Sequence, residues 1–355
     1  MNFKKLYELV DAFPISTVLC VGDMMLDEYV SGQINRVSPE APVPIIQRKN
    51  VYTTLGGVGN VAANVVALGC ETSVFYAAAP DKDGETVKQM LEDKHIHTYP
   101  FSAATMTTKK QRIIARKQQI CRIDSEEPLN LTKQQEDKII HQVSSLFPHV
   151  NTVLIADYNK GFITPRVAQG IIQAAREQNK CVLVSPKGTD YEKYKGATLI
   201  KPNLAEFKAI MKQITPGLTE IEALDPADDQ DLQKIEQLAP IMREKLGTSN
   251  LVVTLGQHGI LGSDEDGVIY RPTEEKSVSD ISGAGDTTLA VLGASFGSCI
   301  TLENAMDLAN IGAGVVIEKE GTATLSSREL KSSIRNLFNN EPTTFWFNAS
   351  GPKGK

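Results

Sequence analysis

Short apolar runs separated by amphipathic, helix-like stretches recur along most of this chain. The runs short enough to be buried strands lie at residues 17–21, 72–77, 153–156, 181–184, 198–200 and 251–254. Helical patterns separate most of them, as at residues 59–68, where Gly69 suits the position just after a helix end. Strands that alternate with helices are typical of a parallel sheet covered on both faces. The pattern therefore predicts an α/β fold with a mostly parallel central sheet.

Two stretches, residues 27–52 and 107–124, look like strand pairs and predict a small separate sheet. Three prolines between residues 39 and 44 exclude a helix in the first stretch. In the second, Lys110, Arg112 and Arg116 share one parity, so a strand would place all three on one strongly cationic face. An ordinary solvated face explains the same pattern equally well.

Composition narrows the class of protein. The chain has 355 residues, a net charge of −6 and scattered basic residues, which disfavour a nucleic-acid surface or a polybasic membrane anchor. Its five cysteines are odd in number and far apart, as expected of reduced thiols. The first 16 residues contain no signal-peptide stretch, so we expect a cytoplasmic protein. We expect residues 1–340 to form one domain and residues 341–355 a tail.

The most informative motif is the heptad at residues 280–286. It places Gly283, Ala284, Gly285 and Asp286 just before an apolar run of small residues that predicts a buried helix. Backbone N–H groups at such a helix start form an anion hole, and Asp286 beside it can take a proton from an attacking hydroxyl. Phosphoryl transfer to an alcohol needs this pairing. An acidic residue that only complements the helix dipole is the alternative.

Polar and glycine residues at other predicted strand or helix ends add candidate ligand sites. Gly56, Gly57 and Asn60 precede a helix, and Asp23 and Asp27 follow the first strand. Amide and carboxylate groups there suit the hydroxyls of a small polyol. A plain turn before the helix and simple capping at the strand end remain the alternatives.

Two more motifs follow strands in the second half of the chain. Asn203 and Glu206 suit hydrated magnesium, or simply a helix cap. Residues 254–259 suit a nucleotide backbone, or a tight hairpin. His95 and His97 have no further metal ligands nearby in sequence, so we interpret them as structural.

In this order and at these separations, residues 56–60, 203–206 and 280–286 resemble the motifs of ribokinase-like (PfkB) carbohydrate kinases, over roughly residues 15–330. The resemblance implies a three-layer sandwich with a small β-sheet lid, and ATP and Mg²⁺ as cofactors. It also implies a role for each motif. Asp286 would be the catalytic base, Gly283, Ala284 and Gly285 the anion hole, and Asn203 and Glu206 the phosphate site and the magnesium site, through water. The nucleotide pocket would then include Thr254, Gly256, Gly259 and Asn310.

Four further segments, at residues 22–27, 36–44, 118–124 and 186–190, resemble a narrower group within that family. That group phosphorylates D-glycero-D-manno-heptose 7-phosphate at its anomeric hydroxyl, for ADP-heptose and lipopolysaccharide core synthesis. Ser185 departs from it, because relatives commonly carry aspartate there. A substrate that already carries phosphate needs a cationic clamp, which Lys110, Arg112 and Arg116 would supply. The substrate site would comprise Asp23, Asp27, Gly56, Gly57, Asn60, these three cations and Lys187.

The resemblance further implies a homodimer formed through the lid. Because bifunctional members also carry a nucleotidyltransferase domain, we expect another protein to perform adenylyl transfer here. Activation by a monovalent cation near Asp280 stays open. So do two alternative functions: a kinase of another sugar phosphate, a free sugar or a nucleoside, and a catalytically silent nucleotide- or sugar-binding regulator. An oxidoreductase is disfavoured because no Gly-x-Gly-x-x-Gly follows the first strand.

Overall fold

A nine-stranded sheet forms the centre of the protein, in the order β13-β12-β11-β10-β9-β8-β1-β4-β5. The computed structural model describes residues 2–116, 118–188, 190–274 and 278–340. All neighbouring strands are parallel except at one edge, where β12 and β13 run antiparallel. The strands of this sheet are β1 (Thr17–Gly22), β4 (Glu71–Ala78), β5 (His97–Ser102), β8 (Thr152–Ala156), β9 (Cys181–Ser185), β10 (Leu199–Ile200), β11 (Asn250–Thr254), β12 (Ile260–Ser263) and β13 (Val268–Arg271).

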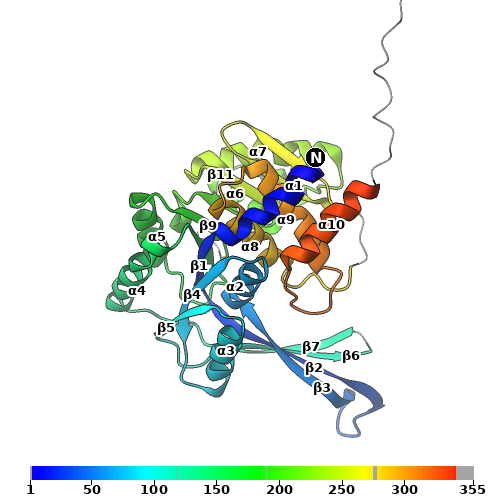
Figure 1. Cartoon of the computed structure of the whole chain (residues 1–355). Helices are drawn as coiled ribbons and strands as arrows, with labels where there is room; N and C mark the ends of the chain where they lie inside the picture. The colour runs from blue at the N-terminus through cyan, green and yellow to red at the C-terminus, as the bar shows by residue number, and fades with distance from the viewer. Residues whose placement is uncertain (1, 117, 189, 275–277, 341–355) are drawn as a thin grey trace, which may run out of the picture.

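Helices cover both faces of the sheet, so the molecule has three layers (Figure 1). Along β1 the side chains alternate between two buried clusters: Val18 and Cys20 join one, and Leu19 and Val21 join the other. The first cluster is covered by α1 (Phe3–Leu9), α2 (Val58–Ala67), α3 (Lys82–Asp93), α8 (Ala284–Gly297), α9 (Leu302–Val316) and α10 (Ser327–Asn340). The second is covered by α4 (Lys133–Ser145), α5 (Pro165–Glu177), α6 (Leu204–Ile214) and α7 (Asp229–Lys245).

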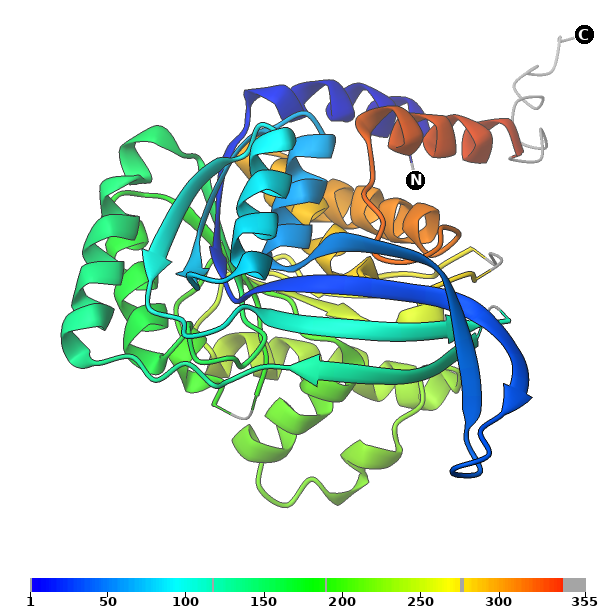
Figure 2. The same ribbon diagram turned by 90° about the horizontal axis from the view of Figure 1, so that it is seen from below.

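A four-stranded second sheet, which we call the lid, has the order β3-β2-β6-β7. Its strands are β2 (Met24–Val37), β3 (Pro44–Gly57), β6 (Thr108–Ala115) and β7 (Gln118–Ser125). Figure 2 shows it reaching away from the helices as a curved ribbon that starts where β1 ends. Because β2 follows β1 after a single residue, Asp23 lies at the junction of the two sheets.

These elements confirm the predicted fold class. Each predicted strand of the central sheet lies within two residues of an observed one, and the helix at 59–68 is α2, followed by Gly69 at φ +95°. Both predicted strand pairs form the lid, although β2 and β3 extend beyond residues 27–52. His97 begins β5. The tail at 341–355 lies outside the described residues.

The prediction for one lid cation was wrong. Strand β6 ends at Ala115, and Arg116 follows it with φ +52°. A residue in that left-handed region leaves the alternation of the strand, so Arg116 does not share the face of Lys110 and Arg112. Its guanidinium instead donates to the carbonyl of Ile34 at 3.4 Å.

Among the described residues, no helix is both long and apolar enough to cross a membrane.

Candidate active site

Asp286 lies in the first turn of α8, where two donors from distant parts of the chain meet its carboxylate. Nδ2 of Asn60, on α2, donates to Oδ2 at 2.8 Å, and the hydroxyl of Tyr158, just after β8, donates to Oδ1. Burial raises the pKa of Asp286, while the hydrogen bonds from Tyr158 and Asn60 oppose that shift. The predicted base is therefore oriented from both sides and more basic than an exposed aspartate.

Asn60 is held so that its amino group faces Asp286. The side-chain amide of Asn64 donates to Oδ1 of Asn60 at 3.2 Å and to its carbonyl at 2.9 Å. Oδ1 of Asn64 in turn accepts from the Thr287 hydroxyl and from the backbone of Leu325, both at 3.0 Å. Because this buried network fixes each amide's donor and acceptor ends, Asn60 presents N–H to the carboxylate.

The start of α8 has the geometry expected of an anion hole. Gly283 adopts φ +85°, and a Cβ there would lie 2.9 Å from Nδ2 of Asn60, so only glycine fits. Gly285 is exposed. No described residue accepts a hydrogen bond from the backbone N–H of Gly285 or Asp286. These N–H groups are therefore available to an anion, and the role of this heptad as an anion hole stays a prediction.

Lys201, which follows β10, lies beside this helix start and was missed by the sequence analysis. Its side chain is buried, and a Cβ built on Gly285 would lie 3.8 Å from its Nζ. Burial lowers the pKa of Lys201, opposed by the charges of Glu206 and Asp286. The signal in the sequence was a charged residue directly after an apolar strand. A buried lysine next to the predicted anion hole would add positive charge where phosphate would lie.

Asn203 and Glu206 form the helix cap that was the alternative interpretation of this motif. Oδ1 of Asn203 accepts from the backbone of Glu206, and Oε2 of Glu206 accepts from the backbone of Asn203, both at 2.9 Å. Nζ of Lys187 donates to Oε1 of Glu206 at 2.8 Å. Lys187 is thus placed at this cap, with no recorded contact to the lid in the described part of the chain.

The metal-binding prediction stays a prediction. No group of three or more His, Cys, Asp or Glu in the described ranges could hold a metal ion directly. Both carboxylate oxygens of Glu206 already accept a protein donor. Such a group suits a hydrated ion held through water, which is how magnesium often binds when phosphate supplies other ligands.

The residues predicted to bind the nucleotide lie in three places: at the end of β11, in the turn that follows it and on α9. Thr254 ends β11 and pairs with Asn203 in a parallel bridge, so these two lie together. Gly256 and Gly259 belong to the turn that joins β11 to β12, which confirms the hairpin interpretation. A Cβ on Gly259 would lie 2.0 Å from the carbonyl oxygen of Arg271, whereas one on Gly256 meets nothing within 4 Å. Asn310, on α9, donates to the carbonyl of Pro272 at 2.9 Å.

The lid brings Asp27 and Arg112 to the same site. Nη1 of Arg112 donates to Oδ1 of Asp27 at 2.6 Å, and the guanidinium lies over the ring of Tyr29, 5.3 Å from its centroid. The hydroxyl of Thr322, from the loop before α10, lies 2.7 Å from the hydroxyl of Tyr29 and 3.4 Å from Oδ2 of Asp27. Thr322 therefore links the lid to the main domain.

Gly56 and Gly57, at the end of β3, allow that strand to lie close to Asp27 and Asp23. A Cβ on Gly56 would lie 2.6 Å from Oδ2 of Asp27. Gly57 has φ +57°, and a Cβ there would lie 2.3 Å from the carbonyl oxygen of Asp23. Both positions require glycine for steric reasons, whatever they bind.

Asp23 holds the loop that follows β8. Its Oδ2 accepts from the backbone of Tyr158 at 2.7 Å and of Lys160 at 3.2 Å, and its Oδ1 accepts from that of Phe162 at 3.2 Å. Burial and the nearby charge of Asp157 raise the pKa of Asp23 to about 6, and the three N–H donors oppose that rise. The recorded contacts of Asp23 are thus structural, and its predicted contact with substrate stays a prediction.

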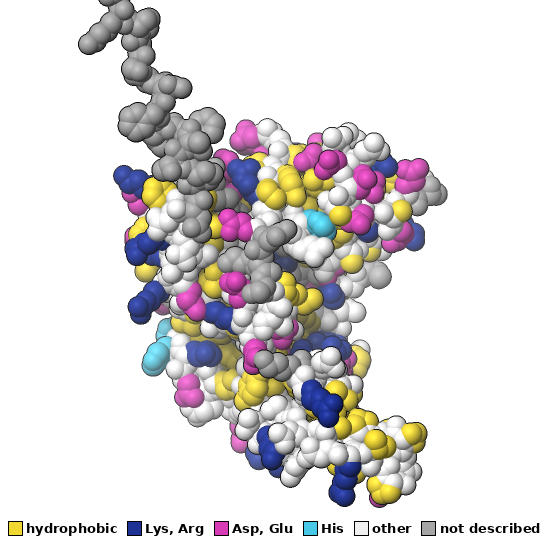
Figure 3. Space-filling view, turned by 90° about the vertical axis from the view of Figure 1, so that its right-hand side faces the viewer, with side chains coloured by type: hydrophobic (Ala, Val, Ile, Leu, Met, Phe, Trp, Pro, Cys, Tyr) yellow, Lys and Arg dark blue, Asp and Glu magenta, His cyan; other side chains and the backbone are white. Residues whose placement is uncertain are grey.

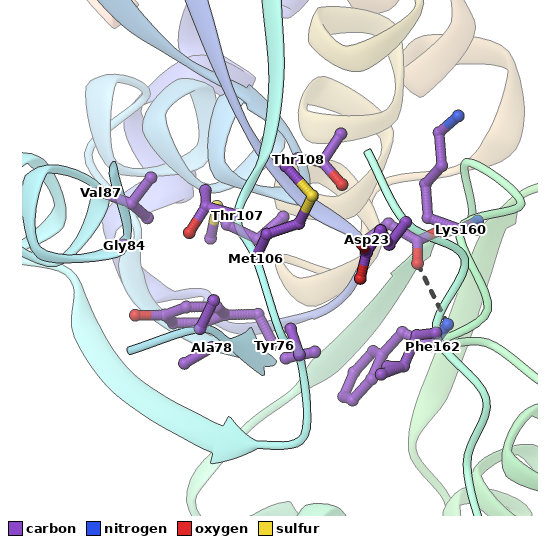
Figure 4. A pocket seen from close by; sticks show the side chains of 16 residues that line it. Asp23, Tyr76, Ala78, Gly84, Val87, Met106, Thr107, Thr108, Lys160 and Phe162 are labelled. Atoms are coloured by element: carbon purple, nitrogen blue, oxygen red, sulfur yellow. Dashed lines mark hydrogen bonds between the residues drawn. The ribbon is translucent and has the colours of Figure 1, made fainter. Parts of the chain in front are cut away.

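A small pocket opens beside Asp23, at the base of the lid. Figure 4 shows its lining, with Asp23, Lys160 and Phe162 toward one side, Gly84 and Val87 toward the other, and Met106, Thr107 and Thr108 between them. Lys110 follows the lining residue Thr108 by two positions on β6, so the alternation of the strand places both on one face. Burial lowers the pKa of Lys110, and the charges of Lys160 and Arg122 act in the same direction, although Asp27 opposes them. Three cations therefore gather here, drawn from β6, β7 and the loop after β8.

Comparison with known proteins shows which family this chain resembles. Residues 16–329 match the family described as pfkB family carbohydrate kinase. The chain is 36% identical over 339 residues to the bifunctional protein HldE of Magnetococcus marinus, covering 93% of this chain and 66% of that protein. It is 34% identical over 336 residues to the bifunctional protein HldE of Desulfatibacillum aliphaticivorans, covering 92% and 64%. The chain thus spans less than two thirds of the length of these relatives.

Solved structures show the same fold. Phosphofructokinase-2 from Escherichia coli in complex with fructose-6-phosphate matches with a TM-score of 0.70 at 16% identity, covering 91% of this chain and 99% of that one. A putative ribokinase from Agrobacterium tumefaciens matches with a TM-score of 0.67 at 17% identity, covering 92% and 99%. At such identities the likeness concerns the fold alone.

Proposed function

This chain belongs to the pfkB family of carbohydrate kinases, and from that premise we propose that it transfers the γ-phosphoryl group of ATP to the anomeric hydroxyl of D-glycero-β-D-manno-heptose 7-phosphate. The product would be heptose 1,7-bisphosphate, a precursor in ADP-heptose and lipopolysaccharide core synthesis. The relatives named HldE, at about 35% identity over most of this chain, support a heptose acceptor. We also propose the cytoplasm as its location, since ATP is the phosphoryl donor.

The main support for an acceptor that already carries a phosphate is the cation cluster at the base of the lid, formed by Lys110, Arg122 and Lys160. Lys160 pairs with Glu126 and Arg122 with Asp124, whereas no ion pair within the described ranges involves Lys110. Asp27 pairs in register with Lys110, and its charge also acts on Asp286, so it lies near both the cluster and the proposed base. A sugar with its hydroxyl at Asp286 and its phosphate at Lys110 would span Asp27. A neutral sugar would leave Lys110 without an ion-pair partner among the described residues.

In the proposed reaction Asp286 accepts the proton of the anomeric hydroxyl as that oxygen attacks the γ-phosphorus. The new O–P bond forms, the bond to the β,γ-bridging oxygen breaks, and ADP leaves with the electron pair. The N–H groups at the start of α8 and the ammonium of Lys201 would stabilise charge on the transferring group. Magnesium, when bound through water at Asn203 and Glu206, would neutralise phosphate charge. Thr254, beside Asn203, would contact the nucleotide.

The assay that tests the acceptor is coupled ADP release with ATP and magnesium. It compares the heptose 7-phosphate with fructose 6-phosphate, ribose and adenosine, and uses Asp286→Asn as the blank. Release that depends on the heptose phosphate and that the blank lacks would support the proposal. Turnover only with another acceptor would keep the kinase and overturn the heptose assignment.

Charge reversal tests the clamp. In Lys110→Glu we expect KM for the sugar phosphate to rise about 10- to 100-fold, the effect of losing a hydrogen bond to a charged group. Lys49→Glu makes the same change at an exposed position of β3 and should leave KM unchanged. Equal effects of the two variants would point to general electrostatics and against a clamp.

We further propose a homodimer formed through the lid. Val51 and Ile123 are 43% and 51% exposed, and strand register places both on the face opposite Asp27. Figure 3 shows hydrophobic side chains at the surface of the projecting lid, among basic ones. Burying this face against a second copy would remove apolar surface from water. Light scattering should give a dimer that Ile123→Glu converts to a monomer, while Val268→Glu on β13 should not.

A further inference from the structure

The hydroxyl of Tyr158 has no role in the reaction described so far, yet it contacts the proposed base directly. It donates to Oδ1 of Asp286, and Asn60 donates to Oδ2, so each carboxylate oxygen already has a protein donor when no acceptor is bound. Burial and the charge of Asp286 raise the pKa of Tyr158, so the phenol keeps its proton. This side chain is therefore a permanent donor at the place where a proton is to be accepted.

The backbone that carries Tyr158 is fixed on one side by the carboxylate of Asp23. Asp23 accepts from the N–H of Tyr158 itself and from two further N–H groups of the same loop. Figure 4 shows one of these bonds, between Asp23 and Phe162. Three charge-assisted hydrogen bonds from one carboxylate restrict the conformation of this loop strongly.

The residue before Tyr158 is held as well. The carboxylate of Asp157 lies 2.6 Å from Nζ of Lys193 and accepts from the hydroxyl of Tyr194 at 2.7 Å. Lys193 also donates to the carbonyl of Ile163 at 3.1 Å. Because the residues on both sides of Tyr158 are held by these contacts, its side chain has a fixed position beside Asp286.

A kinase whose base is exposed to water risks hydrolysing ATP before the acceptor arrives. In that side reaction a water oxygen bonds to the γ-phosphorus, the bond to the β,γ-bridging oxygen breaks, and ADP leaves with the electron pair. The water's proton passes to the base, so the products are ADP, inorganic phosphate and a proton. Only a water hydrogen-bonded to the carboxylate can lose its proton in this way.

We propose that Tyr158 determines the preference of this site for a sugar hydroxyl over water, by occupying the hydrogen-bonding position on Oδ1 of Asp286 that an activated water would take. A carboxylate accepts several hydrogen bonds, so an acceptor hydroxyl still reaches Asp286. That hydroxyl is oriented by the rest of the sugar, whereas a water has no other contacts to align it. Because Tyr158 occupies one hydrogen-bonding position on Asp286, activation of water is reduced more than activation of the acceptor hydroxyl. The inference rests on Asp286 being the base.

The test measures inorganic phosphate released from ATP without any acceptor, and ADP released with the heptose 7-phosphate. Tyr158→Phe keeps the ring and removes only the hydroxyl. We expect acceptor-free phosphate release to rise about tenfold relative to the unsubstituted protein, while transfer changes much less. Tyr194→Phe, which removes a hydroxyl from the support of the same loop, should leave the ratio of hydrolysis to transfer unchanged. Thermal unfolding verifies that both variants fold.

The double variant Tyr158→Phe with Asp286→Asn tests whether the added hydrolysis depends on Asp286 as the base. It should lose the added hydrolysis, because the water would no longer have a base. If Tyr158→Phe lowers hydrolysis and transfer together, or if Tyr194→Phe raises the ratio equally, the hydroxyl only supports the loop and the inference is overturned. If Asp286→Asn alone leaves transfer intact, the assignment of the base fails, whatever the acceptor is.

Discussion

Nδ2 of Asn60 lies 2.8 Å from Oδ2 of Asp286, although 226 residues separate them in the chain. The contact joins the first turn of α2 to the first turn of α8. A neutral donor at this place orients the carboxylate without neutralising it, because an amide carries no titrating proton. The pair thus defines which lone pairs of Asp286 remain available for an acceptor.

Changing this donor to a second carboxylate should shift the pH dependence of the kinase. In Asn60→Asp two like charges would lie at hydrogen-bonding distance, which strongly raises one of the two pKa values of the pair. Because a protonated Asp286 is no base, kcat at neutral pH should fall and recover as pH increases. The measurement is kcat against pH.

Asn151→Asp is the matched control for that substitution. Oδ1 of Asn151 accepts from Thr17 at 2.9 Å beside the first residue of β1, a contact that aspartate preserves. Its pH profile should match that of the unsubstituted protein. An unshifted acid limb in Asn60→Asp would contradict the view that Asn60 tunes the base.

Replacing Lys201, the buried lysine beside the proposed anion hole, should reduce turnover. Lys201→Met keeps an unbranched side chain of similar length and removes the charge near Glu206 and Asp286. We expect kcat to fall about 10²- to 10³-fold, the range for loss of one group that stabilises transition-state charge. Steady-state kinetics measures the fall, and urea unfolding verifies that stability is retained. A loss of stability with unchanged kcat would assign Lys201 to packing.

Asp23 should make the free energy of unfolding depend on pH with an unusual sign. Its pKa is raised to about 6 in the folded protein, above the ordinary value of about 3.9. Between these values the native state binds a proton that the unfolded chain lacks, so this group's contribution to stability increases as pH falls. From pH 7.5 to pH 5 the gain is about 1.4 kcal/mol.

Asp23→Asn isolates that contribution, because all other titrating groups are shared with the unsubstituted protein. The destabilisation caused by this substitution should be about 1.4 kcal/mol larger at pH 5 than at pH 7.5, as measured by urea unfolding at both values. A cost that is equal at the two pH values, or larger at pH 7.5, would show that Asp23 titrates in its usual range.

Thr322 should affect acceptor binding more than turnover. Thr322→Val keeps the shape of the side chain but removes its hydrogen bonds to Tyr29 and Asp27. Loss of one or two such bonds, at about 0.5–1.5 kcal/mol each, should raise KM for the sugar several-fold. Thr324→Val removes a hydroxyl from the same loop with no recorded side-chain partner among the described residues, and should leave KM unchanged. Equal effects on both would contradict the link between lid and main domain.

Much of the fold could be predicted because its signals are local. The strands of the central sheet appear as apolar runs, and Gly283, Gly285 and Asp286 mark a helix start through residue types that such a start requires. The bounds of the lid strands were less accurate, since β2 and β3 extend over residues 24–26 and 53–57, which are mostly buried against the main core, so these strand ends depend on packing between distant segments. Arg116 was misplaced because a strand end depends on register with its neighbours.

The sequence by itself determined the layers of the fold, the anion-hole motif and the candidate base, because each depends on residues close together in the chain. Only the tertiary structure decided what surrounds that base. Asn60 and Tyr158 donate to Asp286 from 226 and 128 residues away, and the charge of Lys201, which follows β10, acts on it. The physical reason is that parallel strands end at one edge of the sheet, so side chains that no local pattern connects are brought together there.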